Sequence, residues 1–279
     1  MNEKRPQRVR TKGAPPSLEE QIAGLRKFRD LSREIQQPIG GARGQGAAFV
    51  LASMREADDC VDGVFRLVPG EGHQAELATP IGVLARSLLE GAIKISYLTG
   101  DRAARYRQME NSGLEEFYKH ASSNSMREST LDPMSNIPAH VVKRIKEVRK
   151  ANKPPKRHCP KCVPEPAVRA PVPAELRVLP SLRDMAVAVG AEWQYDVAYR
   201  WESGAVHFSY QAVMNRVEFD EPTKRYLVIG TRPWRLVEVL AVSTTAYAMF
   251  LRAAAALLGR GLPESLRDFG WEKIPLLES

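Results

Sequence analysis

Apolar residues recur at the three- and four-residue spacing of amphipathic helices along most of the chain. A first helix is predicted over 17–37, where Ser17 and Glu20 form a capping box ahead of the apolar stripe. A second helix is predicted over about 47–67. The glycine-rich segment 40–46 lacks the lysine and the preceding strand of a phosphate-binding loop, so it is predicted to be a connection.

The clearest helical pattern lies over 80–99. Thr79 is predicted as the N-cap, Pro80 as the first helical residue and Gly100 as the residue that follows the end. The residues between are apolar nearly all round, which is typical of a buried central helix.

Prolines divide the second half of the chain. Residues 154–180 hold eight of the 20 prolines, so they are predicted to be an extended connector or an ordered loop. The other predicted elements are two more polar helices, a long helix, a β-hairpin and a last helix, at about 101–121, 138–151, 181–210, 217–230 and 233–259.

This pattern predicts an all-α fold, an antiparallel helical bundle with a small β-hairpin near 217–230. Residues 1–16 are predicted to be a disordered basic tail. Residues 17–279 are predicted to form a single helical domain that carries a basic and proline-rich insertion at about 140–180.

Charge is concentrated in two segments of the chain. The 41 Lys and Arg residues exceed the 33 Asp and Glu residues by eight, and residues 1–16 carry +4 while 143–161 carry +8, so the rest is acidic. Such basic segments attract RNA or another polyanion, although a solvated helix face that runs into a charged linker has the same composition. The residues predicted to bind nucleic acid are Lys143, Arg144, Lys146, Arg149, Lys150, Lys153, Lys156 and Arg157.

Composition and motifs argue against several classes of protein. Three cysteines are too few for a disulfide-stapled secreted scaffold, and the N-terminus lacks the apolar core of a secretory signal. The longest charge-free apolar stretch has 13 residues, too short for the ~20 of a membrane span, so a cytoplasmic protein without membrane contact is expected. Motifs of classical hydrolases, zinc proteases, NTPases and dinucleotide enzymes are absent.

Two polar stripes interrupt the apolar helices. One stripe of the predicted helix 181–210 consists of Asp196, Arg200, Ser203 and His207. Within it, Arg200 lies only ~20° from His207 around the helix axis. On the central helix, Arg86 and Glu90 are four residues apart, as are Glu90 and Lys94. A polar stripe between apolar flanks must find internal partners or line a cavity.

Two segments of the chain resemble a known protein family: LARSLLEGAIKISYL, from residue 84, and YRWESGAVHFS, from residue 199. They resemble a widespread, uncharacterised bacterial family of all-helical proteins with an Arg-x-x-x-Glu helix and a Ser-x-x-x-His helix. The resemblance implies a helical fold, in which Arg86, Glu90, Tyr199, Ser203 and His207 occupy the recurring polar positions.

The spacing of Arg200 and His207 is also similar to the Arg-x(4–6)-His motif of HEPN-type ribonucleases. That resemblance implies a homodimer in which His207 acts as general base on an RNA 2′-hydroxyl, Arg200 holds the phosphate and no metal is required. Imidazole titrates near neutral pH and guanidinium binds phosphate with two prongs, as this chemistry needs.

A Cys-x-x-Cys turn lies in the basic segment. The spacing of Cys159 and Cys162 allows both thiolates to bind one zinc ion, and His158 is a weaker candidate ligand. A complete structural zinc site has four ligands, which Cys60, His120, His140 or a second subunit would have to complete. The alternative is a pair of reduced loop thiols.

Two functions follow from the sequence. One is a metal-independent ribonuclease, similar to toxins or antiviral defence effectors, with Arg200 and His207 as catalytic residues. The other is a non-catalytic helical binding protein in which Arg86, Glu90, Ser203 and His207 form a buried structural network.

Overall fold

The computed structural model describes residues 17–37, 45–68, 78–121, 137–153, 171–199, 217–228 and 233–261. The chain divides into two compact units, of which the first consists of Met1–Thr99 and Leu182–Ser279 and the second of Gly100–Ser181. The insertion predicted at about 140–180 lies within the second unit, which extends back to Gly100. The predicted N-terminal tail lies outside the described residues.

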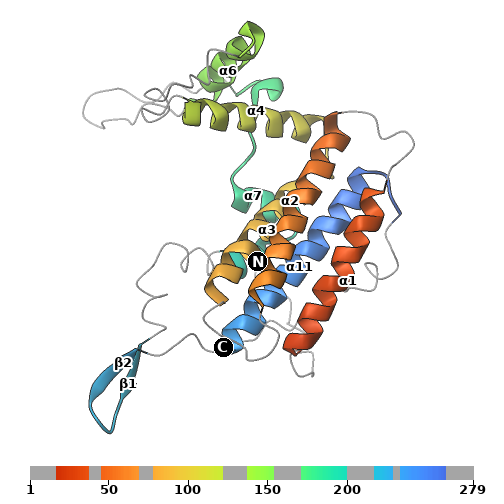
Figure 1. The fold of residues 1–279 in the computed structure, drawn as a ribbon. Coiled ribbons are helices and arrows are strands. Elements are labelled where there is room, and N and C mark those ends of the chain that lie inside the picture. The colour runs from red at the N-terminus through yellow and green to blue at the C-terminus, as the bar shows by residue number, and fades with distance from the viewer. Residues whose placement is uncertain are drawn as a thin grey trace, which may run out of the picture. The chain divides into compact units, whose positions relative to one another are not determined.

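Four long helices form the core of the first unit, and the predicted all-α fold is confirmed. They are α1 (Leu18–Gln36), α2 (Gln45–Leu67), α3 (Ala78–Leu98) and α11 (Pro233–Leu257), which lie side by side in Figure 1. The last helix, α11, packs against each of the other three. The largest buried side chains come from all four helices and include Phe28, Met54, Leu88 and Phe250.

The helix starts agree with the sequence in one case and differ in another. The capping box of α1 is present, since Ser17 Oγ accepts from the Glu20 amide at 3.2 Å and Glu20 Oε2 accepts from the Ser17 amide at 2.6 Å. The predicted start of α3 is wrong, because α3 begins at Ala78. Thr79 lies inside its first turn, and Pro80 is its third residue.

The helix α11 is the core helix of this unit. Its segment Arg235–Leu257 is long and apolar enough to cross a membrane, but 83% of its apolar stretch is buried inside the protein, which accounts for its composition. The hydroxyls of Ser243, Thr244 and Thr245 donate to carbonyls four residues earlier at 2.7–2.8 Å. These bonds satisfy polar groups that would otherwise be costly to bury.

The single helix predicted over 181–210 is wrong in its first part. Instead, α7 (Leu182–Ala188) ends where Gly190 takes a φ of 71° and the Ala191 amide donates to the Ala186 carbonyl. This left-handed glycine closes the helix as in a Schellman motif. A short α8 (Glu192–Gln194) and a π-helical turn, η3 (Tyr195–Tyr199), then follow.

A two-stranded antiparallel sheet lies where the sequence predicts a hairpin. The strands are β1 (Val217–Asp220) and β2 (Arg225–Val228), and Val217 pairs with Val228.

The second unit contains α4 (Arg102–Ala121), α6 (Ala139–Asn152) and the 3₁₀ turn η2 (Ala174–Leu176). Asn111 of α4 is 1% exposed, and its amide nitrogen donates to the carbonyls of Glu175 and Arg177 at 3.0 and 2.8 Å. Asn152 at the end of α6 donates to the Leu176 carbonyl at 2.6 Å. Residues 171–180 of the proline-rich segment are therefore an ordered loop that side chains of both helices hold.

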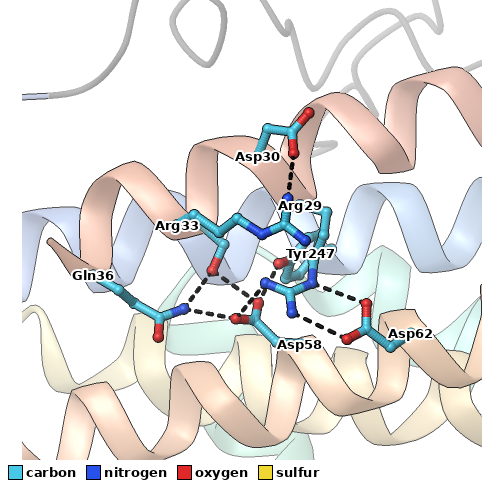
Figure 2. A network of polar contacts seen from close by, with 8 residues as sticks. Arg29, Asp30, Arg33, Gln36, Asp58, Asp62 and Tyr247 are labelled. Atoms are coloured by element: carbon cyan, nitrogen blue, oxygen red, sulfur yellow. Dashed lines mark hydrogen bonds and ion pairs between the residues drawn. The ribbon is translucent and has the colours of Figure 1, made fainter.

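A buried carboxylate links three helices of the first unit (Figure 2). Asp58 of α2 accepts four hydrogen bonds, from Ser32 Oγ at 2.8 Å, Arg29 Nη1 at 2.8 Å, Gln36 Nε2 at 2.6 Å and the hydroxyl of Tyr247 on α11. Each carboxylate oxygen accepts two of them. Burial and the adjacent carboxylate raise the pKa of Tyr247 well above its usual range, so its hydroxyl remains a donor.

The Arg29 guanidinium is shared between two carboxylates. It binds Asp62 with two prongs, Nε to Oδ1 and Nη2 to Oδ2, both at 3.0 Å, and turns Nη1 to Asp58. The hydrogen bond to Asp62 raises the pKa of Arg29 and lowers the pKa of Asp62. Arg29 thus balances the charge of Asp58, which has little access to water.

We expect Asp58→Ala to lower the free energy of unfolding by about 3–5 kcal/mol, because Nη1 of Arg29 and three neutral donors lose the buried carboxylate that accepts from them. Tyr247→Phe removes a single donor and should cost about 1–3 kcal/mol. Urea unfolding measures both changes. The control is Asp59→Ala on the exposed face of the same helix, which should stay within about 0.5 kcal/mol of the parent. Equal effects of Asp58→Ala and Asp59→Ala would show that the network does not hold the bundle.

Candidate functional site

Arg86 of α3 is held by the π-helical turn. Its Nη2 donates to the hydroxyl of Tyr199 at 2.9 Å, and its Cζ lies 4.6 Å from the centroid of the same ring. Both side chains are half-buried. The contact joins residues 113 positions apart in the sequence.

The ring of Tyr199 is stacked on a second tyrosine. The ring centroids of Tyr195 and Tyr199 are 5.0 Å apart, with 15° between the ring planes. The Arg86 guanidinium therefore contacts the ring of Tyr199, which in turn stacks on the ring of Tyr195. Single π-helical turns occur frequently at functional sites.

Glu90 and Lys94, on the next two turns of α3, pair with each other. Lys94 Nζ donates to Glu90 Oε1 at 2.7 Å, and both side chains are about a third exposed. Arg86 has Tyr199 as its partner instead, so the two halves of the predicted polar stripe on α3 make separate contacts.

The remaining residues of the predicted site, Arg200, Ser203 and His207, lie outside the described residues. Their approach to Arg86 and Glu90 stays a prediction. The structure describes three of the six supporting and catalytic positions. It brings Arg86 and Tyr199 together and leaves Glu90 paired with Lys94.

The region from α2 to the end of the hairpin turn matches a family model. Residues 61–224 match a family of unknown function, DUF5677, and this is more than half of the chain. The chain belongs to this family. Helix α11, Asp58 and all four residues that bind Asp58 lie outside the part that matches DUF5677. No curated protein and no solved structure matches the chain.

The second unit presents a row of lysines along α6 and at its C-cap, Lys153. Lys143, Lys146, Lys150 and Lys153 are all exposed, and at 100° per residue they fall within an arc of about 80°. The opposite face buries Ile145 and Val148. We call these four residues the lysine stripe, which extends for about 15 Å along the helix axis.

An open hollow lies alongside the lysine stripe. It has a volume of about 640 Å³, and its lining combines three of the lysines with the apolar side chains of Ile137, Ala139 and Val142. Glu147 also lines the hollow and reduces its positive charge. The hollow therefore places lysine ammonium groups beside apolar side chains.

Two arginines of the predicted nucleic-acid-binding set make internal contacts. Arg144 donates to Asn111 Oδ1 at 3.2 Å and to the Glu175 carbonyl, so it helps to hold the ordered loop. Arg149 lies over the ring of Tyr118, with Cζ 3.8 Å from the ring centroid. Lys156 and Arg157 lie outside the described residues.

Within the described part of the chain, no three His, Cys, Asp or Glu side chains form a group that would hold a metal ion. The predicted zinc ligands His158, Cys159 and Cys162 lie outside that part. Burial raises the pKa of the Cys60 thiol, and the nearby carboxylates of Asp59 and Glu56 raise it further.

The residues that bind Asp58 were not predicted from the sequence. A signal was present, since Asp58 lies among Met54, Ala57 and Val61 on the apolar face of α2, where a carboxylate requires a partner. The internal role of Asn111 was also missed, and a single asparagine in a polar helix gives no comparable signal.

Substitutions of Tyr199 should separate the two parts of its contact with Arg86. Tyr199→Phe keeps the ring under the guanidinium and should cost about 0.5–1.5 kcal/mol for the lost hydrogen bond. Tyr199→Leu also removes the cation–π contact and should cost up to about 2 kcal/mol more. The free energy of unfolding measures both, and hydrogen exchange of the amides of 195–199 locates the effect. Equal losses for Phe and Leu would mean that the ring contact contributes nothing.

Proposed function

We propose that this protein binds RNA through the lysine stripe of its second unit. The observation that carries the proposal is the division of charge between the units. Residues 100–181 contain 16 basic and 9 acidic residues, a net charge of +7, whereas the rest of the chain has 25 basic and 24 acidic residues. Nearly all of the net charge therefore belongs to less than a third of the chain.

The geometry of α6 supports a phosphate backbone as the ligand. The lysines follow one another at three or four residues, which is about 4.5–6 Å along the axis, so a strand that runs along the helix meets one ammonium after another. Ammonium groups bind phosphate as point charges and tolerate small changes of register. A protein partner with acidic residues is less favoured, because it would need carboxylates at matching intervals.

Cleavage of the bound RNA is the finer part of the proposal, with His207 as general base and Arg200 as the phosphate ligand. The spacing of these two residues and their resemblance to the HEPN motif support it. The contact of Arg86 with Tyr199 adds support, because it anchors to α3 the residue immediately before Arg200. In this proposal the protein is cytoplasmic and acts as a homodimer, no cofactor takes part in the reaction, and zinc at Cys159 and Cys162 is structural.

The alternative keeps RNA binding and omits the reaction. In that case His207 and Ser203 join Arg86 and Glu90 in a structural network of the first unit. The catalytic and structural proposals differ in the effect expected when the imidazole of His207 is removed. Loss of a general base leaves the fold intact, whereas loss of a buried hydrogen-bonded histidine destabilises it.

Neutralising the lysine stripe should weaken RNA binding and its dependence on salt. We expect replacement of the four lysines by glutamine to reduce the slope of log K against log salt by about 3, since each contact with a single strand contributes about 0.7. Fluorescence anisotropy of a labelled short RNA, measured over a salt series, gives both slopes.

The matched control removes four exposed cations from the first unit. We expect affinity and slope to remain those of the parent when glutamine replaces Lys27, Arg55, Arg66 and Arg252. A similar loss in both variants would mean that overall charge, and not the lysine stripe, attracts RNA. A parent protein that does not bind RNA at all would refute the proposed function.

Cleavage is tested by incubating the full chain with mixed RNA in EDTA. His207→Ala should reduce the rate by about 10²–10⁴-fold, as for removal of other general bases, with unchanged circular dichroism and RNA affinity. Arg200→Lys should also be strongly impaired, because an ammonium lacks the two-pronged contact with phosphate. Intact RNA after incubation with the parent, together with an unfolded His207→Ala variant, would favour the structural alternative.

A further inference from the structure

We infer that Arg149, supported by Tyr118, is a stacking platform for an unpaired base, and that the second unit therefore takes single-stranded RNA. The inference rests on the proposed RNA binding and specifies its substrate class. It comes from the contact between α6 and α4 at the side of the lysine stripe.

Arg149 approaches an aromatic ring more closely than Arg86 or Arg26 does. Its Cζ lies 3.8 Å from the centroid of Tyr118, against 4.6 Å for Arg86 over Tyr199 and 6.0 Å for Arg26 over Phe65. A distance of 3.8 Å is that of two groups in van der Waals contact. The guanidinium of Arg149 is thus in direct contact with the ring of Tyr118.

The side chain of Arg149 is nevertheless exposed, while Tyr118 is half-buried. The tyrosine therefore restricts an arginine that remains accessible to a ligand. A planar guanidinium that is already held in place loses less conformational entropy when a base stacks on it. Arginine planes and aromatic rings are the surfaces on which proteins stack the unpaired bases of RNA.

Arg149 also borders the lysine stripe. It follows Lys146 by three residues and precedes Lys153 by four, so its side chain lies about 40–60° from theirs around the axis of α6. A strand whose phosphates contact the lysines would carry its bases to one side of the stripe. Phosphate contacts on one row and base stacking beside it are the combination found in proteins that bind single strands.

A duplex does not offer the same contact, because its bases are stacked on one another and paired. A row of cations alone would accept either form, as well as an inorganic polyanion. The stacked arginine is thus the feature that distinguishes a single strand from these ligands.

The test compares the parent with Arg149→Lys in the full chain. This substitution keeps the charge and removes the plane, so affinity for inorganic polyphosphate should remain within about twofold, as for an exchange of one cation for another at a point-charge contact. Affinity for a short single-stranded RNA should fall by about fivefold or more, the loss expected for one stacked base. Affinity for a duplex of the same length should change as little as that for polyphosphate.

A second readout detects the stacking itself. RNA that carries 2-aminopurine at successive positions should lose fluorescence at one or more of them when the parent binds, and less when Arg149→Lys binds. Tyr118→Leu should resemble Arg149→Lys, because it leaves the guanidinium unsupported, whereas Tyr118→Phe keeps the ring and should resemble the parent.

The inference is overturned if Arg149→Lys binds the single strand as the parent does, or if the parent prefers the duplex. In both cases the salt dependence supplied by the lysine stripe would persist, so the proposed RNA binding would stand. A parent that binds neither RNA would instead overturn the proposed function and this inference with it.

Discussion

The first unit depends on how it satisfies one buried charge. Asp58 is 4% exposed, and the full hydrogen-bonding capacity of its carboxylate is used by Arg29, Ser32 and Gln36 of α1 and by Tyr247 of α11. A buried carboxylate without these donors is far more costly than an apolar side chain of similar size. The network therefore favours one arrangement of α1, α2 and α11, because a shift of any of these helices would leave a charge without its partners.

The second unit solves a related problem with two asparagines and an arginine. A loop that returns along two helices carries carbonyls that need donors when they are buried. Asn111 and Asn152 supply them from α4 and α6, and Arg144 adds a third donor from the inner side of α6. Because these contacts occupy the inner face, the lysines are left on the outer one. The same helix thus divides its basic residues between holding the loop and facing solvent.

The sequence predicted what regular patterns encode and missed what single residues decide. Apolar periodicity located the long helices and the all-α fold, since their buried faces repeat at a fixed spacing. It did not predict the break at Gly190, where one left-handed glycine ends a helix that the flanking apolar residues would continue. The approach of Arg86 to Tyr199 was likewise beyond the pattern, because it joins two helices far apart in the chain and depends on a π-helical turn. The position of Asp58 on an apolar helix face indicated that it needs a partner. The pattern did not identify the partners, because they lie on two other helices.

The separation of charge from the candidate site has a physical consequence. A positive field draws a polyanion toward the second unit irrespective of its sequence, and the near-neutral first unit adds little to that attraction. In the proposed function, an RNA strand bound to the lysine stripe is tethered to the chain that carries Arg200 and His207, so its effective concentration depends on the connecting chain. The polar residues on and near α3 then need little affinity of their own. Under the same proposal, Arg86 and Tyr199, which are half-buried and bind each other, hold the residue before Arg200 in place and leave the attraction of RNA to the second unit.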